Sequence, residues 1–408
     1  MYDFVVVGAG PAGSRFARRA AEAGRDVVVL ERGAVGEPLA CSGHVSADLW
    51  EFTPPGARAE LLENEIRGAR FHVGGPESDG QLFYTRETIS YVIDRVGLDR
   101  LLARTAEEAG VDLREGHSVL GVAEGEDHVD VTVRSSGKHG TDGGDTGTKA
   151  GVGGITSDES ETANGTGTTT RNGTGTKTET EDGSRTETIR ARMVVGCDGP
   201  VSTVRRECSL PEPGEKLQGL LGFSGETEPQ EFVDVHLTAP SFFAWRIPRG
   251  EGGTEYGLAA PPGERASDLF DSFTAEYGVD VGEVHAGMIP ISPPERVTGH
   301  RSLLVGDAAA QTKPFTGGGI VYGMTAADHT AKRVDPRDPD TLADYERAWR
   351  DDLSTEIRLG AWIRRAYSLP KPVQNVGLRA LSGEIDVHMD KPTSVFSTAQ
   401  LKAFLSRS

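Results

Sequence analysis

Residues 2–31 read YDFVVVGAGPAGSRFARRAAEAGRDVVVLE, and this stretch decides the fold. An apolar run is followed by a Gly-x-Gly-x-x-Gly turn, an alanine-rich segment with helical periodicity and a second apolar run. This order predicts a βαβ unit of the kind that binds dinucleotides. The predicted elements are a strand at 2–7, a helix at 14–24 and a strand at 26–30.

Each glycine of the turn has its own task in such a unit. Gly8 permits the tight turn, Gly10 lets the backbone approach a pyrophosphate, and Gly13 allows the helix to pack closely. Ala12 lies in the same phosphate turn. Glu31 stands 18 residues after Gly13 at the end of the second strand, where it can accept hydrogen bonds from ribose hydroxyls. A purely structural glycine turn would not explain this register.

A second glycine-rich region indicates that the dinucleotide is FAD. Residues 303–309 (LLVGDAA) predict a strand ending in Gly-Asp, and residues 314–320 (PFTGGGI) lead into a small-residue helix from about Val321. A nicotinamide enzyme has no obvious use for this region. In FAD enzymes so organised, the Asp contacts the ribityl or ribose part, and the helix N-terminus stabilises anionic reduced flavin. The candidate contacts here are Asp307, Gly318, Gly319 and Ile320.

A third segment, residues 194–199 (VVGCDG) ahead of Ser202 and Arg205, is of the same kind. Alone it is equally typical of a strand followed by a structural Asp-Gly turn. In order with the other two it supports FAD.

The full order of motifs resembles the geranylgeranyl reductase family, within the wider group of flavoprotein monooxygenase-like folds. The motifs are the glycine turn, Cys41-Ser42-Gly43, Arg95-x-x-x-Asp99, Gly-Cys-Asp-Gly and Gly-Asp-Ala-Ala with Gly-Gly-Gly-Ile. The resemblance covers nearly the whole chain outside residues 135–188. It implies a Rossmann-like FAD-binding domain, a β-sheet substrate domain and a helical C-terminal region.

The resemblance also implies further cofactor contacts. Arg95 matches the family's basic residue on a helix near the cofactor, but it could instead be a surface partner of Asp99, an i,i+4 pair worth about 0.2–0.5 kcal/mol. Val119 matches a backbone contact near adenine, and Arg32 would flank the adenosine. The contacts implied near the flavin and adenosine are Arg32, Cys41, Ser42, Gly43, Val45, Arg95 and Val119.

Residues 240–248 (PSFFAWRIP) resemble the family's Pro-x-x-Tyr-x-Trp-x-Phe-Pro substrate motif. Trp245 and Pro248 match, whereas Phe243 stands at the Tyr position and Ile247 at the Phe position. The first change removes a hydroxyl and with it any hydrogen-bonding task of that Tyr. Apolar contact with a prenyl chain is retained.

By this resemblance the reaction is saturation of carbon-carbon double bonds in geranylgeranyl chains of archaeal membrane ether lipids. An unactivated alkene needs a hydride from reduced flavin, a proton for the other carbon and a dry pocket. Cys41 is the candidate for the pocket wall or the proton relay, and His44 is a weaker proton donor. The plainer interpretation of Cys41 is a small buried residue in a loop crossing the flavin.

Two other functions remain open at this level. An FAD monooxygenase or halogenase shares the scaffold, but residues 244–248 show only half of a halogenase Trp-x-Trp-x-Ile-Pro stretch. A flavin electron-transfer protein would need an exposed flavin edge or an iron-sulfur cluster, and three scattered cysteines cannot form a four-cysteine site. The electron donor is expected to be NAD(P)H, bound transiently, or a reduced ferredoxin-like protein.

The domain boundaries follow from the composition. Residues 135–188 are almost entirely Gly, Thr, Ser and charged residues, which predicts a disordered insert without catalytic function at the tip of a hairpin. Trp349, Leu353, Ile357 and Trp362 recur at roughly helical spacing and are expected in the core rather than as a membrane anchor. The predicted domains are FAD-binding (1–134, 189–206 and 296–335), substrate (207–295) and C-terminal helical (336–408).

The 408 residues carry a formal charge of -19, with 34 Arg and only 9 Lys. Such a surface repels nucleic acid and suits a very salty cytoplasm, so we expect a halophile protein with no nucleic-acid partner. Three cysteines and no leader predict a cytoplasmic location and no metal site. The insert holds -4 and the rest -15, so the folded surface itself is acidic. Contact with the inner face of the membrane would then be peripheral, through an apolar pocket mouth.

Overall fold

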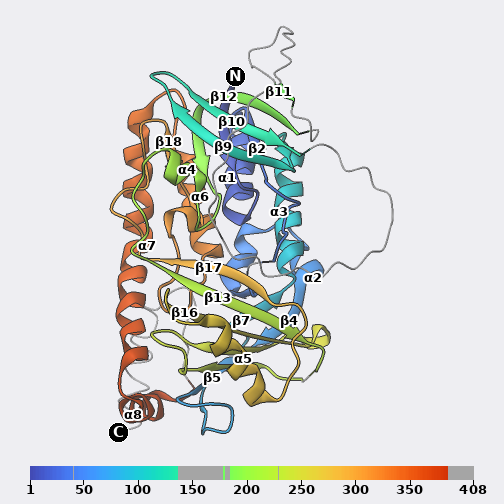
Figure 1. Cartoon of the computed structure of the whole chain (residues 1–408), viewed down its shortest axis with the longest axis vertical. Coiled ribbons are helices and arrows are strands. Elements are labelled where there is room, and N and C mark those ends of the chain that lie inside the picture. The colour runs from blue at the N-terminus through green and yellow to red at the C-terminus, as the bar shows by residue number, and fades with distance from the viewer. Residues whose placement is uncertain (40, 137–177, 180–183, 228, 385–408) are drawn as a thin grey trace, which may run out of the picture.

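The structure is a computed structural model that describes residues 1–39, 41–136, 178–179, 184–227 and 229–384 (Figure 1). One sheet lies at the end that carries the N-terminus, and a second, curved sheet lies below it. A long C-terminal helix runs beside both sheets. The predicted fold class is therefore confirmed.

The predicted βαβ unit is present. Strand β1 (Tyr2–Val7) pairs in parallel with β2 (Val27–Leu30), and α1 (Pro11–Glu22) connects them. The helix begins three residues earlier than predicted, because Pro11 has no N–H to lose at the first helical position and its φ already suits a helix. Residues 4–7 of β1 and all of β2 are buried and apolar, as expected for strands covered on both faces.

The first sheet has the order β8-β2-β1-β12-β10-β9, with β18 also beside β12. Strands β8, β2, β1, β12 and β18 run in parallel, so their carboxyl ends meet at one edge. Helix α1 packs against both α3 (Arg95–Glu108) and α6 (Ile320–Arg333). The remaining strands are β8 (Asp112–Arg114), β9 (His117–Glu124), β10 (Val129–Ser135), β12 (Arg185–Gly196) and β18 (Ser302–Leu304).

The predicted hairpin around the insert is confirmed, because β10 and β12 pair antiparallel with Ser135 opposite Arg185. Its boundary was wrong by a few residues. Residues 185–188 belong to β12, and β11 (Thr178–Glu179) pairs with the same strand. The predicted disorder of residues 137–177 and 180–183 falls outside the described residues.

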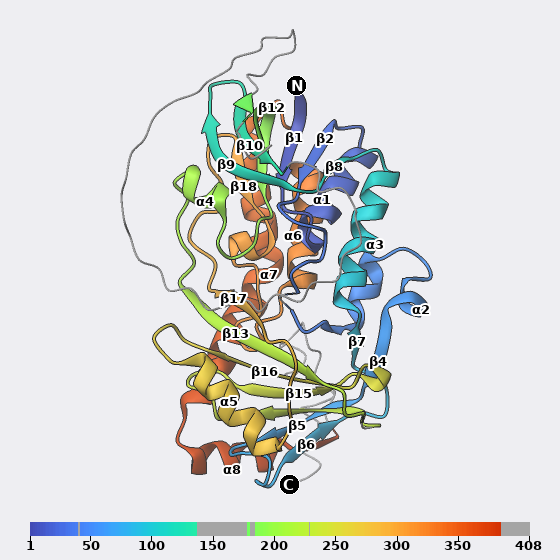
Figure 2. The ribbon, with the colours of Figure 1, turned by 45° about the vertical axis from the view of Figure 1, so that its right-hand side comes forward.

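The second sheet has the order β17-β13-β16-β15-β14-β5-β6-β19 (Figure 2). Its β13–β17 strands come from the predicted substrate region, but β5 (Gly68–His72) and β6 (Gln81–Tyr84) come from the segment assigned to FAD binding. The pairing of β5 with β14 joins the two segments, so the boundary at residue 134 does not separate the sheets. The other strands are β13 (Glu215–Ser224), β14 (Phe232–His236), β15 (Ala244–Pro248), β16 (Thr254–Ala260), β17 (His285–Ile291) and β19 (Gly383–Glu384).

Shorter elements complete the joint between the sheets. Strands β3 (His44–Ser46), β7 (Ser90–Ile93) and β4 (Leu62–Ile66) form a small antiparallel sheet. Helix α5 (Ala266–Tyr277) packs on β16 and β13 of the second sheet. The remaining short helices are η1 (Ala47–Phe52), α2 (Ala57–Leu61), α4 (Thr203–Glu207), η2 (Gly250–Gly252), η3 (Gly306–Ala309) and η4 (Pro339–Thr341).

The C-terminal region is helical over its described part. Helix α7 (Leu342–Arg365) passes both sheets, and η5 (Ala366–Ser368) connects it to α8 (Lys371–Leu381). Trp349, Leu353 and Ile357 are buried as predicted, but Trp362 is 63% exposed, so the predicted core stripe was wrong at its last member. None of the described helices is long and apolar enough to cross a membrane.

Candidate functional site

The glycine-rich segments converge at the carboxyl edge of the first sheet. A Cβ added at Gly8 would lie 2.4 Å from the carbonyl oxygen of Cys197, and one at Gly306 would lie 3.0 Å from the Cβ of Ala12. Gly8 and Gly306 both have positive φ. The N-terminus of α1 therefore packs directly against the Gly-Asp segment, as a ligand at the end of parallel strands requires.

Two glycines of the turn differ in what surrounds them. A Cβ at Gly13 would lie 2.0 Å from the carbonyl oxygen of Gly8, so close packing explains this glycine. A Cβ at Gly10 would meet no protein atom within 4 Å. The space beside Gly10, at the uncapped start of α1, fits the approach of a pyrophosphate.

The Glu31 carboxylate lies at this turn, where its Oε2 accepts from the Ala9 N–H at 2.8 Å and its Oε1 from the Gly33 N–H at 3.2 Å. The His117 N–H donates to the carbonyl oxygen of Glu31, so the start of β9 runs beside the same strand end. Val119, on β9, is half-buried, and Arg32 is exposed. These positions suit the adenosine end of a dinucleotide, and each assigned contact stays a prediction.

A charged cluster adjoins the turn. Arg95 pairs with Asp99 at 2.6 Å, as the helical spacing predicts, but the side chains are only 12% and 10% exposed, so this is not a surface pair. Burial opposes the charge of Arg95, yet its pKa is raised because the Asp99 carboxylate and the Cys41 sulfur outweigh that effect. The Nε of Arg95 is buried without a hydrogen-bond partner among the described residues. Such an orphaned donor fits a site that an anionic or carbonyl-bearing cofactor completes.

Asp307 lies near the same guanidinium. Burial raises its pKa to about 6, and the Arg95 charge lowers it only in part. A Cβ at Gly319 would lie 2.5 Å from the Oδ1 of Asp307, so the loop before α6 can pass this carboxylate only without a side chain. Gly318 and Ile320 flank that glycine at the start of α6, which has no side-chain cap. The arrangement fits the ribityl chain and pyrimidine end of FAD.

The segment after residue 40 runs beside the end of β7. Gly43 has φ +74, and a Cβ there would lie 2.6 Å from the carbonyl oxygen of Ile93. The Ile93 N–H in turn donates to the Gly43 carbonyl at 3.1 Å. Cys41 and Ser42 are half-buried, and Val45 is 4% exposed in β3. The chain thus brings Cys41 to Arg95, two residues beyond Ile93.

The large apolar side chains of the predicted substrate motif lie in one core of the second sheet, whereas Ala244 lies in the other core, on the side of α5. Phe242 and Phe243 stack with ring centroids 4.4 Å apart, and Trp245 meets Phe243 edge-on at 5.9 Å. A Cβ at Gly257 would lie 2.3 Å from the Trp245 indole, so this glycine makes room for the ring. Pro248 is buried where β15 ends. We call the apolar cluster the side chains of Phe242, Phe243, Trp245, Ile289 and Tyr367.

The apolar cluster touches the loop that begins α6. A Cβ at Gly317 would lie 3.1 Å from Ile289 and 3.4 Å from Phe242. The Tyr367 hydroxyl donates to the Phe315 carbonyl at 2.9 Å, and its ring meets Phe243 edge-on at 5.8 Å. The structure therefore places the substrate motif against the predicted flavin-side loop.

Sequence reasoning missed a buried charge cluster at the joint. The Arg249 guanidinium donates to the Ser42 carbonyl at 2.5 Å and to the Ile93 carbonyl at 2.9 Å. It also binds the carboxylates of Glu255 at 2.9 Å and Glu63 at 2.6 Å. Arg249 therefore ties the Cys41 segment to the substrate sheet. Its position directly after the substrate motif was the only signal in the sequence.

Glu255 is fully buried and also accepts from the Trp245 Nε1–H at 2.8 Å. Burial raises its pKa to about 7, although the nearby Arg249 lowers it in part. Burial likewise raises the pKa of Glu63. Two carboxylates thus share one arginine beside the substrate motif.

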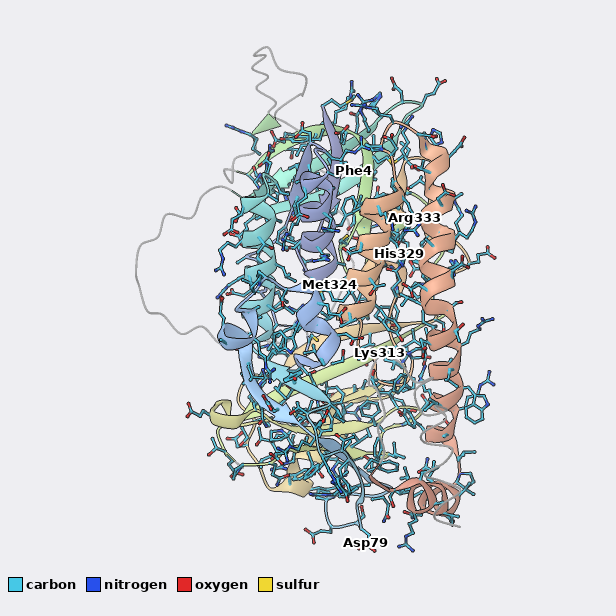
Figure 3. All side chains as sticks on the ribbon, turned by 180° about the vertical axis from the view of Figure 1, so that it is seen from behind. Phe4, Asp79, Lys313, Met324, His329 and Arg333 are labelled. Atoms are coloured by element: carbon cyan, nitrogen blue, oxygen red, sulfur yellow. The ribbon has the colours of Figure 1, made fainter. Side chains whose placement is uncertain are left out.

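Lys313 was also missed. It is 5% exposed and lies at mid-height of the molecule (Figure 3). A Cβ at Gly318 would lie 3.0 Å from its Nζ, so this ammonium sits over the loop that begins α6. In a chain with only nine lysines, a lysine between the Gly-Asp and Gly-Gly-Gly segments was a usable signal.

In the third glycine-rich segment, residues 194–199, the acidic residue Asp198 has a structural role. Asp198 accepts from the Ser202 hydroxyl and from the N–H groups of Thr203 and Val204, which caps α4. Arg205 is 1% exposed and donates to the Ala308 carbonyl at 3.0 Å, which ties α4 to the Gly-Asp segment. These side chains support the site without facing it. Among the described residues no cluster of His, Cys, Asp and Glu is placed to hold a metal.

Comparison with known proteins gives the family. The family model described as FAD binding domain matches residues 1–145 and 153–265, so the chain belongs to this family. A digeranylgeranylglycerophospholipid reductase 2 of Methanothermobacter thermautotrophicus is 29% identical over 415 residues, which covers 94% of this chain and 92% of that protein.

The solved structures agree on the fold. A geranylgeranyl bacteriochlorophyll reductase-like protein of Thermoplasma acidophilum superposes with a TM-score of 0.74 at 21% identity, covering 99% of this chain and 96% of the other. A flavin-dependent halogenase superposes with a TM-score of 0.62 at 18% identity, covering 99% and 76%. Since reductase-like and halogenase structures share the scaffold, the fold alone does not select the reaction.

Proposed function

From its place in the FAD binding domain family, we propose that this chain is an FAD-dependent reductase that saturates double bonds of geranylgeranyl chains in archaeal membrane ether lipids. The observation that carries the proposal is the apolar cluster, which lies against the loop at the start of α6 and contains the predicted substrate motif. The full-length similarity to digeranylgeranylglycerophospholipid reductases points to the same lipid class.

The bound cofactor would supply the hydride for one alkene carbon. Gly10, Ala12 and the uncapped start of α1 would hold its pyrophosphate, and Glu31 its ribose. Asp307, Gly319 and the start of α6 would hold the ribityl chain and pyrimidine. The apolar cluster would orient the prenyl chain and exclude water.

Each saturated bond also needs one proton at the second carbon. The Cys41 thiol is our candidate donor, because its segment is held beside Arg95 by Ile93 and Arg249. After donation the thiolate would lie beside the Arg95 guanidinium. Water would return the proton between turnovers. Two electrons per bond come from the donor, which we propose is NAD(P)H or a reduced ferredoxin-like protein.

The alternatives have weaker support. A halogenase or monooxygenase is matched by fold, but residues 244–248 keep only the second half of the halogenase stretch. A protein that only transfers electrons would have no use for an apolar cluster against the flavin-side loop. The reductase therefore remains the preferred function.

The decisive experiment reduces the purified holoprotein with dithionite under nitrogen and adds an unsaturated archaeal ether phospholipid. We expect flavin reoxidation without oxygen and a product that gains two hydrogens per double bond, measured by mass spectrometry. The saturated lipid is the control and should leave the flavin reduced. Reoxidation that requires oxygen would instead support a monooxygenase or halogenase.

The proton donor is tested by Cys41→Ala in the same assay. We expect turnover to fall by about 100-fold, within the range typical of lost general acid catalysis, while flavin content stays normal. Cys208→Ala is the matched control, because Cys208 is half-buried against the core of the first sheet. Unchanged turnover in Cys41→Ala would reduce Cys41 to a pocket wall.

A further inference from the structure

The end of α7, η5 and α8 carry a concentration of exposed apolar side chains. Of the eleven large apolar side chains that are exposed among the described residues, five lie within residues 362–381. Their exposed fractions run from 45% to 70%. We call these five the C-terminal patch: Trp362, Leu369, Val373, Val376 and Leu381.

The charge around the C-terminal patch has the opposite sign to the rest of the chain. Residues 357–383 contain five basic residues and no acidic residue, in a protein of net charge -19. Arg358, Arg365 and Lys371 form no ion pair with any described residue. Of the other two, Arg364 is held by the Glu215 carboxylate at 2.6 Å, whereas Arg379 lies 3.7 Å from Asp79, which is 89% exposed (Figure 3). Arg358, Arg365 and Lys371 are exposed and therefore available to an anionic surface.

The inner side of the same segment packs against the core of the second sheet. Leu378 of α8 and Tyr367 of η5 pack against the core that contains the apolar cluster. The Gln374 amide holds the two pieces together by donating to the Tyr367 carbonyl at 2.8 Å. Val373 and Val376 are on the exposed side of α8, whereas Gln374 is 7% exposed. One face of this segment thus adjoins the apolar cluster while the other faces outward.

We propose that the C-terminal patch docks this protein on a membrane surface bearing anionic lipid headgroups. This inference rests on the proposed function, because it assumes a lipid substrate. A short helix with apolar residues on one side, basic residues around them and a tryptophan nearby is suited to the interface of a bilayer. Each basic residue near an anionic leaflet adds electrostatic attraction.

A second copy of the chain fits the C-terminal patch less well. In a twofold dimer the same patch meets itself, so the basic residues of the two copies would face one another. An anionic membrane satisfies both the apolar and the basic groups. The acidic surface elsewhere would also orient the protein, with this end toward the lipid.

The test uses the full-length holoprotein and sedimentation with vesicles of phosphatidylglycerol and phosphatidylcholine, at about 1 M and at about 0.1 M salt, where the Debye length is about 3 Å and about 10 Å. The variant Val373→Asp/Val376→Asp changes only exposed positions of α8. We expect its vesicle partition coefficient to fall about tenfold or more, since it loses apolar contacts and gains repulsion. Val284→Asp is the matched control, because Val284 is 44% exposed but lies outside the patch, and its binding should not change.

Activity separates this proposal from the proposed function. With lipid dispersed in detergent, the double variant should turn over like the wild type, whereas with lipid embedded in vesicles it should be slower. Turnover of dispersed lipid without vesicle binding would overturn the docking surface and leave the reductase intact. Vesicle binding without any lipid reduction would overturn the proposed reductase function and leave the docking surface intact.

Three further outcomes would also overturn docking through the patch. The double variant and the wild type could bind vesicles equally. The wild type could be a dimer that the double variant converts to a monomer, which would assign the patch to a second copy. A chain ending at residue 384 could bind vesicles while the full chain does not, which would assign the patch to residues 385–408.

Discussion

The two halves of the site are held in different ways. In the nucleotide half, Gly8 and Gly13 let backbone pass against backbone, and Gly306 lets the chain approach the Ala12 side chain. In the substrate half, buried charges and rings do the positioning, with Arg249 between two carboxylates and Trp245 over Gly257. The nucleotide half therefore depends on the absence of side chains at its glycines. The substrate half depends on contacts between particular side chains.

The largest expected effect tests the joint between the halves. Arg249→Gln leaves Glu63 and Glu255 buried without their shared cation and frees the Ser42 and Ile93 carbonyls. Removing one partner of a buried ionic group typically costs about 3–5 kcal/mol, so we expect a loss of that size in the free energy of unfolding. Chemical denaturation of the holoprotein measures it.

Arg358→Gln is the control for this change, because Arg358 is exposed and forms no ion pair among the described residues. If Arg249→Gln proved no more destabilising than this control, the joint would not depend on the buried arginine. Arg249→Lys should be intermediate, because one ammonium cannot reach all four partners of the planar guanidinium.

The next effect probes the nucleotide half. Gly10→Ala adds a methyl group that meets no protein atom within 4 Å, so the apoprotein should keep its stability. The methyl group would occupy the space proposed for the pyrophosphate, so FAD affinity should fall about tenfold or more, equivalent to about 1.4 kcal/mol. Titration of the apoprotein with FAD, followed by flavin fluorescence, gives the affinity.

Gly13→Ala provides the contrast, since its methyl group would lie 2.0 Å from the Gly8 carbonyl oxygen and should destabilise the apoprotein itself. Normal FAD binding by Gly10→Ala would show that the open space beside Gly10 is not the pyrophosphate site.

The nucleotide half was largely predictable and the joint was not, for a physical reason. The glycine tasks, Glu31 and the Gly-Asp segment belong to local strand-turn-helix units, whose spacing is visible along the chain. Arg249 instead meets Ser42 across 207 residues and Ile93 across 156 residues. No periodicity records such a contact. Arg95 is an intermediate case. Its spacing to Asp99 predicted the ion pair, but nothing in the spacing predicted that the pair would be buried.

A smaller effect concerns Glu255 and the pH dependence of stability. Its pKa is raised in the folded protein from 4.5 to about 7, so between these values the folded state binds more protons than the unfolded state. Stability should then fall as pH rises from about 4.5 to about 7, and the cost should be complete above that window. Glu255→Gln removes this titration. The loss in the free energy of unfolding between pH 5 and pH 8 should therefore be smaller in this variant than in the wild type, by on the order of 1 kcal/mol.

Unfolding midpoints of the two proteins at these pH values give the comparison. Glu22→Gln is the matched control, because Glu22 lies outside the site. Burial raises its pKa, but Arg18 and Arg19 together outweigh that effect and lower it. Identical slopes for wild type and Glu255→Gln would mean that Glu255 stays ionised throughout, held by Arg249.

The smallest expected effect asks whether Tyr367 supplies the hydroxyl that Phe243 lacks. Tyr367→Phe keeps the ring against Phe243 and removes only the hydrogen bond to the Phe315 carbonyl. A net loss of about 1 kcal/mol in stability is expected for one such bond. Because that carbonyl belongs to the loop beside the proposed flavin site, kcat should also fall by a few-fold while flavin content stays normal.

Phe243→Tyr in the Tyr367→Phe background then restores a hydroxyl from the other ring. Recovery of kcat in the double variant would show that the site needs a hydroxyl there whichever strand or helix carries it, whereas a further loss would show that position 243 must remain apolar.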